Sequence, residues 1–122
     1  MANVINWFEI PAKNFDRACK FYSKVLGGDI HKVESPGKTL GFLPGTSPDS
    51  VGGCIAKGEG CEPSTKGSMV YLNGGDDLAK PLSRIVKSGG KIVMPKTAIG
   101  ENGFMAVFND TEGNRVALHS MK

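Results

Sequence analysis

Hydrophobic positions repeat along the first part of the chain with two different periods. Residues 4–10 are rich in β-branched and aromatic side chains, which favours a strand. Residues 14–28 carry apolar side chains at helical spacing, which predicts an amphipathic helix with Asn14 or Asp16 as its N-cap. The glycine pair 27–28 is expected to end that helix. The apolar helical positions are Phe15, Ala18, Cys19, Tyr22, Val25 and Leu26.

Short apolar segments bounded by glycine, proline or polar residues follow the helix and predict further strands. These strands lie at residues 30–33, 39–43 and 51–57. Residues 58–67 are polar and contain both glycine and proline, so they are interpreted as a connector.

The same order of elements restarts after the connector. The second set consists of a strand at 68–74, a helix at 76–90, and strands at 90–95, 104–108 and 114–120, the last two joined by a turn at 109–113. The glycine pairs at 27–28 and 89–90 show the repeat at an offset of about 62 residues. The pattern therefore indicates a βαβββ module that occurs twice.

One such module leaves a sheet face open, so two modules are expected to pack together. We predict a single α+β domain over residues 1–122, made of module 1–57, connector 58–67 and module 68–122. Its sheet is expected to be cupped and mostly antiparallel, with the helices outside. Small molecules commonly bind in a concave face of this kind.

Composition narrows the classes of function. The chain has 122 residues and a net charge of +3, and no run of lysine or arginine exceeds two residues, which argues against nucleic-acid binding. The three cysteines form no C-x-x-C pair, so neither a disulfide framework nor a zinc finger is indicated. The N-terminal residues do not resemble a signal peptide and no apolar run reaches membrane-spanning length. A cytoplasmic protein without membrane contact is expected.

Four stretches carry a family resemblance: WFEIP…FDRACKFYSKVLGG, MVYLNGGDDL, GGKIVMPKTAIGENGF and GFMAVFNDTEGNRVALHS. Together they resemble the vicinal oxygen chelate superfamily, which includes glyoxalase I, bleomycin resistance proteins and extradiol dioxygenases. The resemblance covers nearly the whole chain. It implies the glyoxalase-like fold of paired βαβββ modules, frequent dimerisation, and often a divalent metal in the cup. It does not name a substrate, because one fold hosts many functions.

Alternation along the strands indicates which side chains face the cup. In the first strand, Phe8 and Ile10 should pack beneath the helix, which leaves Ile5, Trp7 and Glu9 for the cup. The inward positions of the second module are Met69, Tyr71, Asn73, Arg115, Ala117 and His119. The opposite positions, expected to face the helix, are Val70, Leu72, Val116 and Leu118.

The resemblance also implies where metal ligands would lie, with a His on the first strand and a Glu on the last strand of each module. These positions fall at Trp7 (or Ile5), at Met69 (or Val70) and at Ala117, and strand 51–57 contains no acidic residue. None of these side chains suits a hard or borderline divalent ion. No metal or other cofactor is therefore predicted, and metal-dependent glyoxalase or dioxygenase chemistry is not expected.

Two inward polar residues are candidates for acid–base catalysis. Glu9 is a carboxylate on an otherwise apolar strand, interpreted either as a general base or as the ion-pair partner of a cation such as Arg115. His119 suits proton transfer, but its place near the chain end also fits a solvated strand end. The candidate ligand-binding residues are Trp7, Met69, Tyr71 and Arg115, of which the first three are alternatively core residues.

Three hypotheses for function follow. The first is a metal-free family member, a homodimer that binds a small organic molecule in its cup. The second is a glyoxalase-like lyase or isomerase with Glu9 as the base and His119 assisting. The third is a domain that acts mainly through protein contacts.

Overall fold

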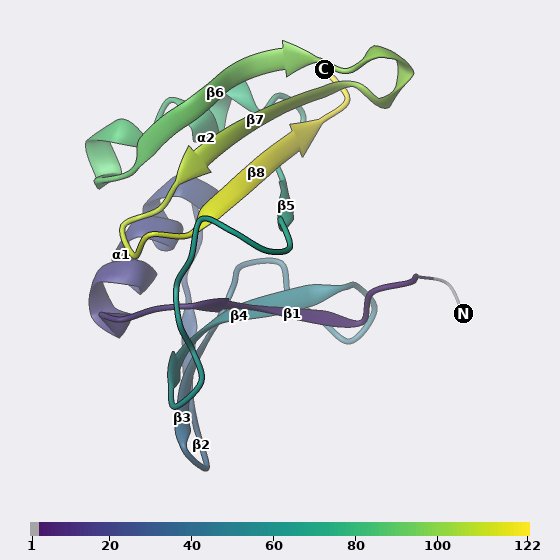
Figure 1. Cartoon of the computed structure of the whole chain (residues 1–122). Helices are drawn as coiled ribbons and strands as arrows, with labels where there is room; N and C mark the ends of the chain where they lie inside the picture. The colour runs from purple at the N-terminus through teal and green to yellow at the C-terminus, as the bar shows by residue number, and fades with distance from the viewer. Residues whose placement is uncertain (1–2) are drawn as a thin grey trace.

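Each half of the chain builds its own four-stranded sheet (Figure 1). The computed structural model describes residues 3–122. The first sheet, in the order β1-β4-β3-β2, contains β1 (Trp7–Pro11), β2 (His31–Ser35), β3 (Lys38–Phe42) and β4 (Gly52–Gly58). The second, in the order β5-β8-β7-β6, contains β5 (Tyr71–Asn73), β6 (Lys91–Ala98), β7 (Phe104–Asn109) and β8 (Arg115–Ser120).

The two sheets share one topology. In each, the first and last strands of the half pair in parallel and the other neighbours are antiparallel. The α+β class and the duplicated βαβββ order are thereby confirmed. In the part of the chain that the structure describes, no strand pairing joins the two sheets, so the cupped sheet is divided into two halves.

The first helix, α1 (Phe15–Leu26), forms where its apolar stripe predicted it. Asn14 is the N-cap, and its side-chain oxygen accepts a hydrogen bond from the Arg17 backbone N–H at 3.0 Å. Gly27 ends the helix with φ of +71°, a left-handed conformation that glycine adopts without strain. Phe21, Tyr22 and Val25 are among its buried residues.

The helix predicted at 76–90 is wrong in extent. Only α2 (Ala79–Leu82) is α-helical, followed by the 3-10 turn η1 (Val86–Ser88). Pro81 lies inside α2 and has no backbone N–H to donate. Beyond it the amides of Arg84 and Ile85 bond to carbonyls three residues back, so the segment tightens into 3-10 geometry.

Some strand ends also differ from the prediction. β1 begins at Trp7 instead of residue 4, and β5 begins at Tyr71 instead of residue 68. β6 extends to Ala98, with two irregularities in its pairing to β7, and the 3-10 turn η2 (Gly100–Asn102) follows it. Among residues 3–122, none of the helices is both long and apolar enough to span a bilayer.

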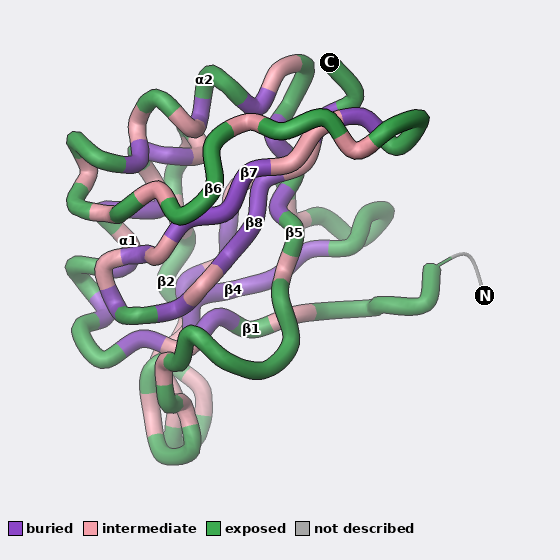
Figure 2. Tube along the Cα trace, turned by 45° about the horizontal axis from the view of Figure 1, so that its top comes forward, coloured by how far each residue is buried: buried purple, intermediate pink, exposed green. Residues whose placement is uncertain are grey.

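One core joins α1 to both sheets. Phe21 and Tyr22 of α1 are fully buried beside Phe108 of β7, and the Phe21 and Tyr22 rings meet edge-on at 4.9 Å. Figure 2 shows the buried positions running along β4, β7 and β8. The side-chain directions expected from alternation are confirmed by the core residues Ile10, Leu72, Val116 and Leu118. Burying each such side chain contributes roughly 1.5–3 kcal/mol.

Candidate functional site

The face of the first sheet that points away from α1 carries an aromatic pair. Trp7 and Glu9 pair with Gly52 and Cys54 of β4, so their side chains alternate with the core residues of β1. The ring of Trp7 meets that of Phe42 edge-on, with centroids 5.2 Å apart, and Trp7 remains 39% exposed. An aromatic surface therefore lies open on this face, called the first-sheet face below.

Glu9 is ion-paired on this face. Its Oε1 atom accepts a hydrogen bond from Lys38 Nζ at 3.3 Å, and both side chains are partly exposed. The hydrogen bond from Lys38, together with the charge of Glu9, raises the pKa of Lys38 above its usual value. The cation is thus Lys38 of β3 and not Arg115, the example that the sequence suggested. An exposed, neutralised carboxylate is a poor match for a general base, which works best when desolvated and free to take a proton.

The open face of the second sheet carries Tyr71, Arg115 and His119, and is called the second-sheet face. Tyr71 is 53% exposed and lies opposite Ala117 in the strand register. The Nε atom of Arg115 donates to Asn109 Oδ1 at 3.3 Å, and no ion pair in the described residues includes Arg115. This face therefore offers a cation without a carboxylate partner.

The side chain of His119 makes a short hydrogen bond to the backbone of η2. Its Nε2 atom lies 2.6 Å from the backbone carbonyl oxygen of Asn102, which can only accept a hydrogen bond. Nε2 therefore donates in this hydrogen bond.

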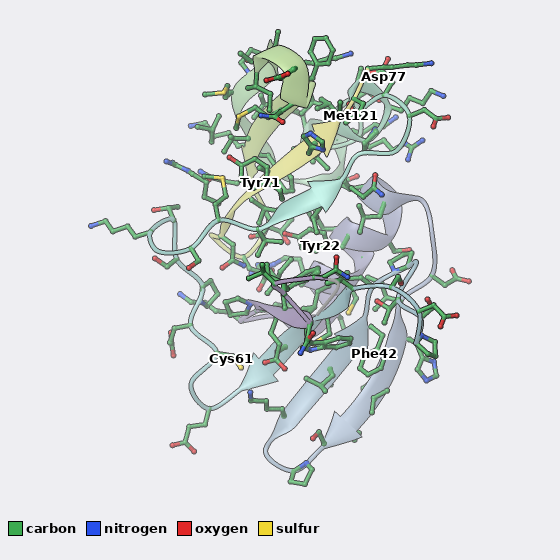
Figure 3. All side chains as sticks on the ribbon, turned by 90° about the vertical axis from the view of Figure 1, so that its right-hand side faces the viewer. Tyr22, Phe42, Cys61, Tyr71, Asp77 and Met121 are labelled. Carbon is green, nitrogen blue, oxygen red and sulfur yellow. The ribbon has the colours of Figure 1, made fainter. Side chains whose placement is uncertain are left out.

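The structure separates the two catalytic candidates. Glu9 and Arg115 line a small pocket of about 120 Å³ between the sheets. His119 and Tyr71 line a different, open depression with Asn73 of β5. Figure 3 shows the same division between the faces, with Phe42 on the lower sheet and Tyr71 on the upper one. Within one chain, Glu9 and His119 do not share a pocket.

The family resemblance implies metal ligands at positions whose side chains in this chain do not suit a divalent ion. Trp7, Met69 and Ala117 offer no hard or borderline donor. Cys54, which faces the cup from β4, is fully buried, and burial raises the pKa of its thiol to about 11, so it stays protonated. Among residues 3–122, no three His, Cys, Asp or Glu side chains gather as a metal site would require.

A buried polar cluster in the β7–β8 turn was missed by the sequence reasoning. Glu112 has a fully buried side chain, and its carboxylate accepts hydrogen bonds from the backbone N–H groups of Lys13 and Asn14 at 2.8 and 2.6 Å. It also accepts one from Arg17 Nε at 2.6 Å. The turn of the second module thus holds the start of α1 in the first.

Two neighbours of Glu112 complete this cluster. Asp110 accepts a hydrogen bond from the Tyr22 hydroxyl at 2.7 Å. Burial, followed by the charge of Asp110, raises the pKa of Tyr22 well above its usual value, which keeps the hydroxyl as a donor. Asn114 Nδ2 donates to the Pro11 carbonyl at 2.7 Å. The only sequence signal was a set of acidic and amide residues in a turn between two apolar strands. In the structure, Asp110 and Glu112 stabilise the contact between this turn and α1.

Comparisons with known proteins agree with this architecture. A family model described as the Glyoxalase/Bleomycin resistance protein/Dioxygenase superfamily matches residues 4–118. A glyoxylase-like domain-containing protein from Didymella fabae is 32% identical over 124 residues, which cover 93% of this chain and 91% of that protein.

Solved structures share the fold. Glyoxalase I from Zea mays superposes with a TM-score of 0.74 at 23% identity, over 95% of this chain and 45% of the maize chain, so this chain spans less than half of that enzyme. The trypanothione-dependent glyoxalase I of Leishmania major gives a TM-score of 0.69 at 22% identity, over 98% and 88% of the two chains. With the family model matching nearly its whole length, the chain belongs to the Glyoxalase/Bleomycin resistance protein/Dioxygenase superfamily.

Proposed function

We propose that this protein binds a small, largely apolar organic molecule between its open sheet faces, without a metal at the family position. One observation carries the proposal. Trp7 and Tyr71 stand exposed on faces opposite the helices, while the positions that would hold a metal carry Trp7, Met69 and Ala117. Large exposed aromatic side chains on a sheet face typically mark a binding surface.

The chemistry of the two faces supports a ligand with an aromatic part and a polar or anionic part. The Trp7–Phe42 pair offers ring edges and faces for stacking. Arg115 offers a guanidinium that is not ion-paired in the described residues. Such a combination of an apolar wall with a few polar groups is typical of small-molecule sites.

A second copy of the chain completes the proposed cup. The first-sheet and second-sheet faces belong to separate sheets, and each leaves large apolar side chains exposed. A two-fold dimer that apposes the first-sheet face of one copy to the second-sheet face of the other generates two equivalent cups. The frequent dimerisation implied by the family resemblance fits this arrangement.

The alternative of a lyase or isomerase has less support. Its proposed base, Glu9, is neutralised by Lys38, and its proposed assistant, His119, lines a different depression. Binding without turnover is therefore the function that the geometry favours.

Trp7 is the only tryptophan in the sequence, so tryptophan fluorescence reports directly on the first-sheet face. We expect anilinonaphthalene sulfonate, an aromatic anion, to quench Trp7 emission saturably. Phe42→Ala should weaken binding about fivefold, since an aromatic contact contributes about 1 kcal/mol. Val86→Ala, at an exposed apolar position on η1, is the matched control and should change nothing. Absence of saturable quenching, or equal affinity in Phe42→Ala, would overturn the binding site.

Two further measurements test the rest of the proposal. Light scattering should give twice the 12.9 kDa mass of one chain. Calorimetric titration with Ni²⁺ or Zn²⁺ should show no stoichiometric binding. A monomer at all concentrations would contradict the composite cup, and about one ion bound per chain would contradict the metal-free site.

A further inference from the structure

We propose that the pocket between the two sheets binds a small carboxylate anion. The pocket has a volume of about 120 Å³ and is bounded by β1, β8 and the segment 62–70. Its lining residues are Glu9, Ile10, Pro11, Glu62, Ser64, Lys66, Ser68, Val70, Asn114, Arg115 and Val116. A ligand there contacts both halves of the chain at once.

The charges that line the pocket favour an anion. No ion pair in the described residues includes Arg115, Lys66 or Glu62. Glu9 is already neutralised by Lys38. Apart from Glu9, the lining therefore contains two cations, Lys66 and Arg115, and one carboxylate, Glu62. The pocket carries a net positive charge. A guanidinium that lacks a carboxylate partner is the protein group best matched to bidentate binding of a carboxylate ligand.

The segment that carries Lys66 is fixed at both ends against β8. The Arg115 N–H bonds to the Ser64 carbonyl at 3.4 Å, and the Ala117 N–H bonds to the Val70 carbonyl at 2.9 Å. Between these points the chain arches away, and Gly67 adopts a left-handed φ of +96° that lets it turn. This arch explains why β5 begins later than predicted, and it places polar side chains over the gap between the sheets.

The hydroxyl group of Ser64 is available to donate a hydrogen bond to a ligand. Its backbone N–H donates to Asn114 Oδ1 at 3.2 Å, and its side-chain oxygen accepts from the Lys66 N–H at 2.9 Å. Because that oxygen acts as the acceptor, the hydroxyl proton is free for an anion. Apolar side chains of Ile10, Val70 and Val116 form the other walls of the pocket. The pocket therefore offers charged and neutral donors beside apolar residues.

The volume limits the ligand. A cavity of about 150 Å³ accommodates benzene, so a pocket of about 120 Å³ suits four to six non-hydrogen atoms. Acetate and pyruvate are in this range. The inference rests on the proposed function at Arg115, which both assign to an anionic group, whereas the rest of the lining apart from Glu9 lies outside the candidate residues of the two sheet faces.

The test is an NMR titration of the ¹⁵N-labelled full chain with sodium acetate and sodium pyruvate. Methylammonium chloride tests for cation binding, and sodium chloride tests for ionic strength. We expect saturable shifts at the amides of Ser64, Lys66 and Arg115 with the carboxylates only. Shifts that stay linear to about 100 mM, or saturable binding of methylammonium, would overturn the proposal.

Matched variants locate the site. Arg115→Gln should lower acetate affinity about tenfold or more, and Lys66→Gln by a smaller factor, because Lys66 supplies a point charge rather than a bidentate fork. Lys87→Gln on the exposed turn η1 removes one charge elsewhere and should not alter binding. Equal affinity in Arg115→Gln, with the fold verified by circular dichroism, refutes the assignment. Quenching of Trp7 by the aromatic probe reports separately on the first-sheet face, so failure of either site is recognised on its own.

Discussion

Replacing Glu112 by glutamine tests whether the β7–β8 turn holds the two halves of the chain together. The carboxylate accepts from the backbone N–H groups of Lys13 and Asn14 and from Arg17 Nε, all within 2.8 Å. Glutamine has nearly the same shape but only one acceptor oxygen. Whichever way its amide is oriented, an NH₂ group faces at least one of these donors.

The loss of stability expected in Glu112→Gln depends on how exposed each hydrogen-bond donor to Glu112 is. A hydrogen bond to a charged group contributes roughly 1.5–3 kcal/mol, but such contributions do not add. The Arg17 side chain is 51% exposed, so solvent screens its pairing, and the two amides can recruit water at the surface. We therefore expect Glu112→Gln to lower the free energy of unfolding by about 2 kcal/mol. With a urea m-value of about 2 kcal/mol/M, the midpoint falls by about 1 M.

The pH dependence gives a sharper signature. Burial pushes the pKa of Glu112 up, but hydrogen bonds from Arg17, Asn14, Lys13 and Thr111 outweigh it and hold this pKa below its usual value of 4.5. A carboxylate with a lowered folded-state pKa contributes its full stability above the unfolded-state pKa and loses it as the pH falls through the folded-state pKa. The difference in the free energy of unfolding between wild type and Glu112→Gln should therefore be constant above about pH 5 and become smaller below it.

Urea unfolding followed by circular dichroism measures this difference between about pH 3 and pH 8. Glu101→Gln, at an exposed position in η2, is the control and should leave the midpoint unchanged. An unchanged midpoint in Glu112→Gln near neutral pH would show that the cluster adds no stability. A difference that stays constant down to about pH 3 would show that the carboxylate charge is not its source.

Three further predictions concern the core. Tyr22→Phe removes the hydrogen bond to Asp110, which keeps its bond from Asn114 Nδ2, so thermal unfolding should show a loss of only about 1 kcal/mol. Gly53→Ala places a Cβ within clashing distance of the Phe8 ring, and this overpacking should cost about 1–3 kcal/mol in the same assay, whereas wild-type stability would mean that the ring moves freely. Burial raises the pKa of the Cys19 and Cys54 thiols to about 11, so mass spectrometry should find both unalkylated by iodoacetamide near pH 8 until urea unfolds the chain; rapid labelling of the native protein would contradict this.

Local patterns predicted the parts of the fold that local forces determine. α1 is set by an apolar stripe, an Asn14 cap and a terminal Gly27, all within one segment, and the structure confirms it. Alternation predicted that Val116 and Leu118 of β8 face the core, and both are buried there, although Ala117 between them is buried as well. The second helix is shorter than predicted because Pro81 has no backbone N–H to donate and the residues after it form 3-10 hydrogen bonds.

Contacts between distant segments could not be predicted. Glu9 meets Lys38, 29 residues away, because β1 and β3 both flank β4. Glu112 meets Asn14 at a separation of 98 residues. Hydrophobic periodicity cannot predict either contact, because both depend on the order of the strands in the folded sheets.

The hydrogen bonds of the β7–β8 turn and the open side of β8 lie on opposite faces of the second sheet. The carboxylate of Glu112 binds the start of α1, on the side of the second sheet that faces the core. From Arg115 onward, alternate residues of β8 point to the other, open side. A change at position 117 therefore leaves the hydrogen bonds of Glu112 intact, because the two sets of side chains lie on opposite faces. The turn motif thus reports the fold, whereas the proposed binding chemistry depends on residues of the opposite face, among them Arg115 beside the pocket between the sheets.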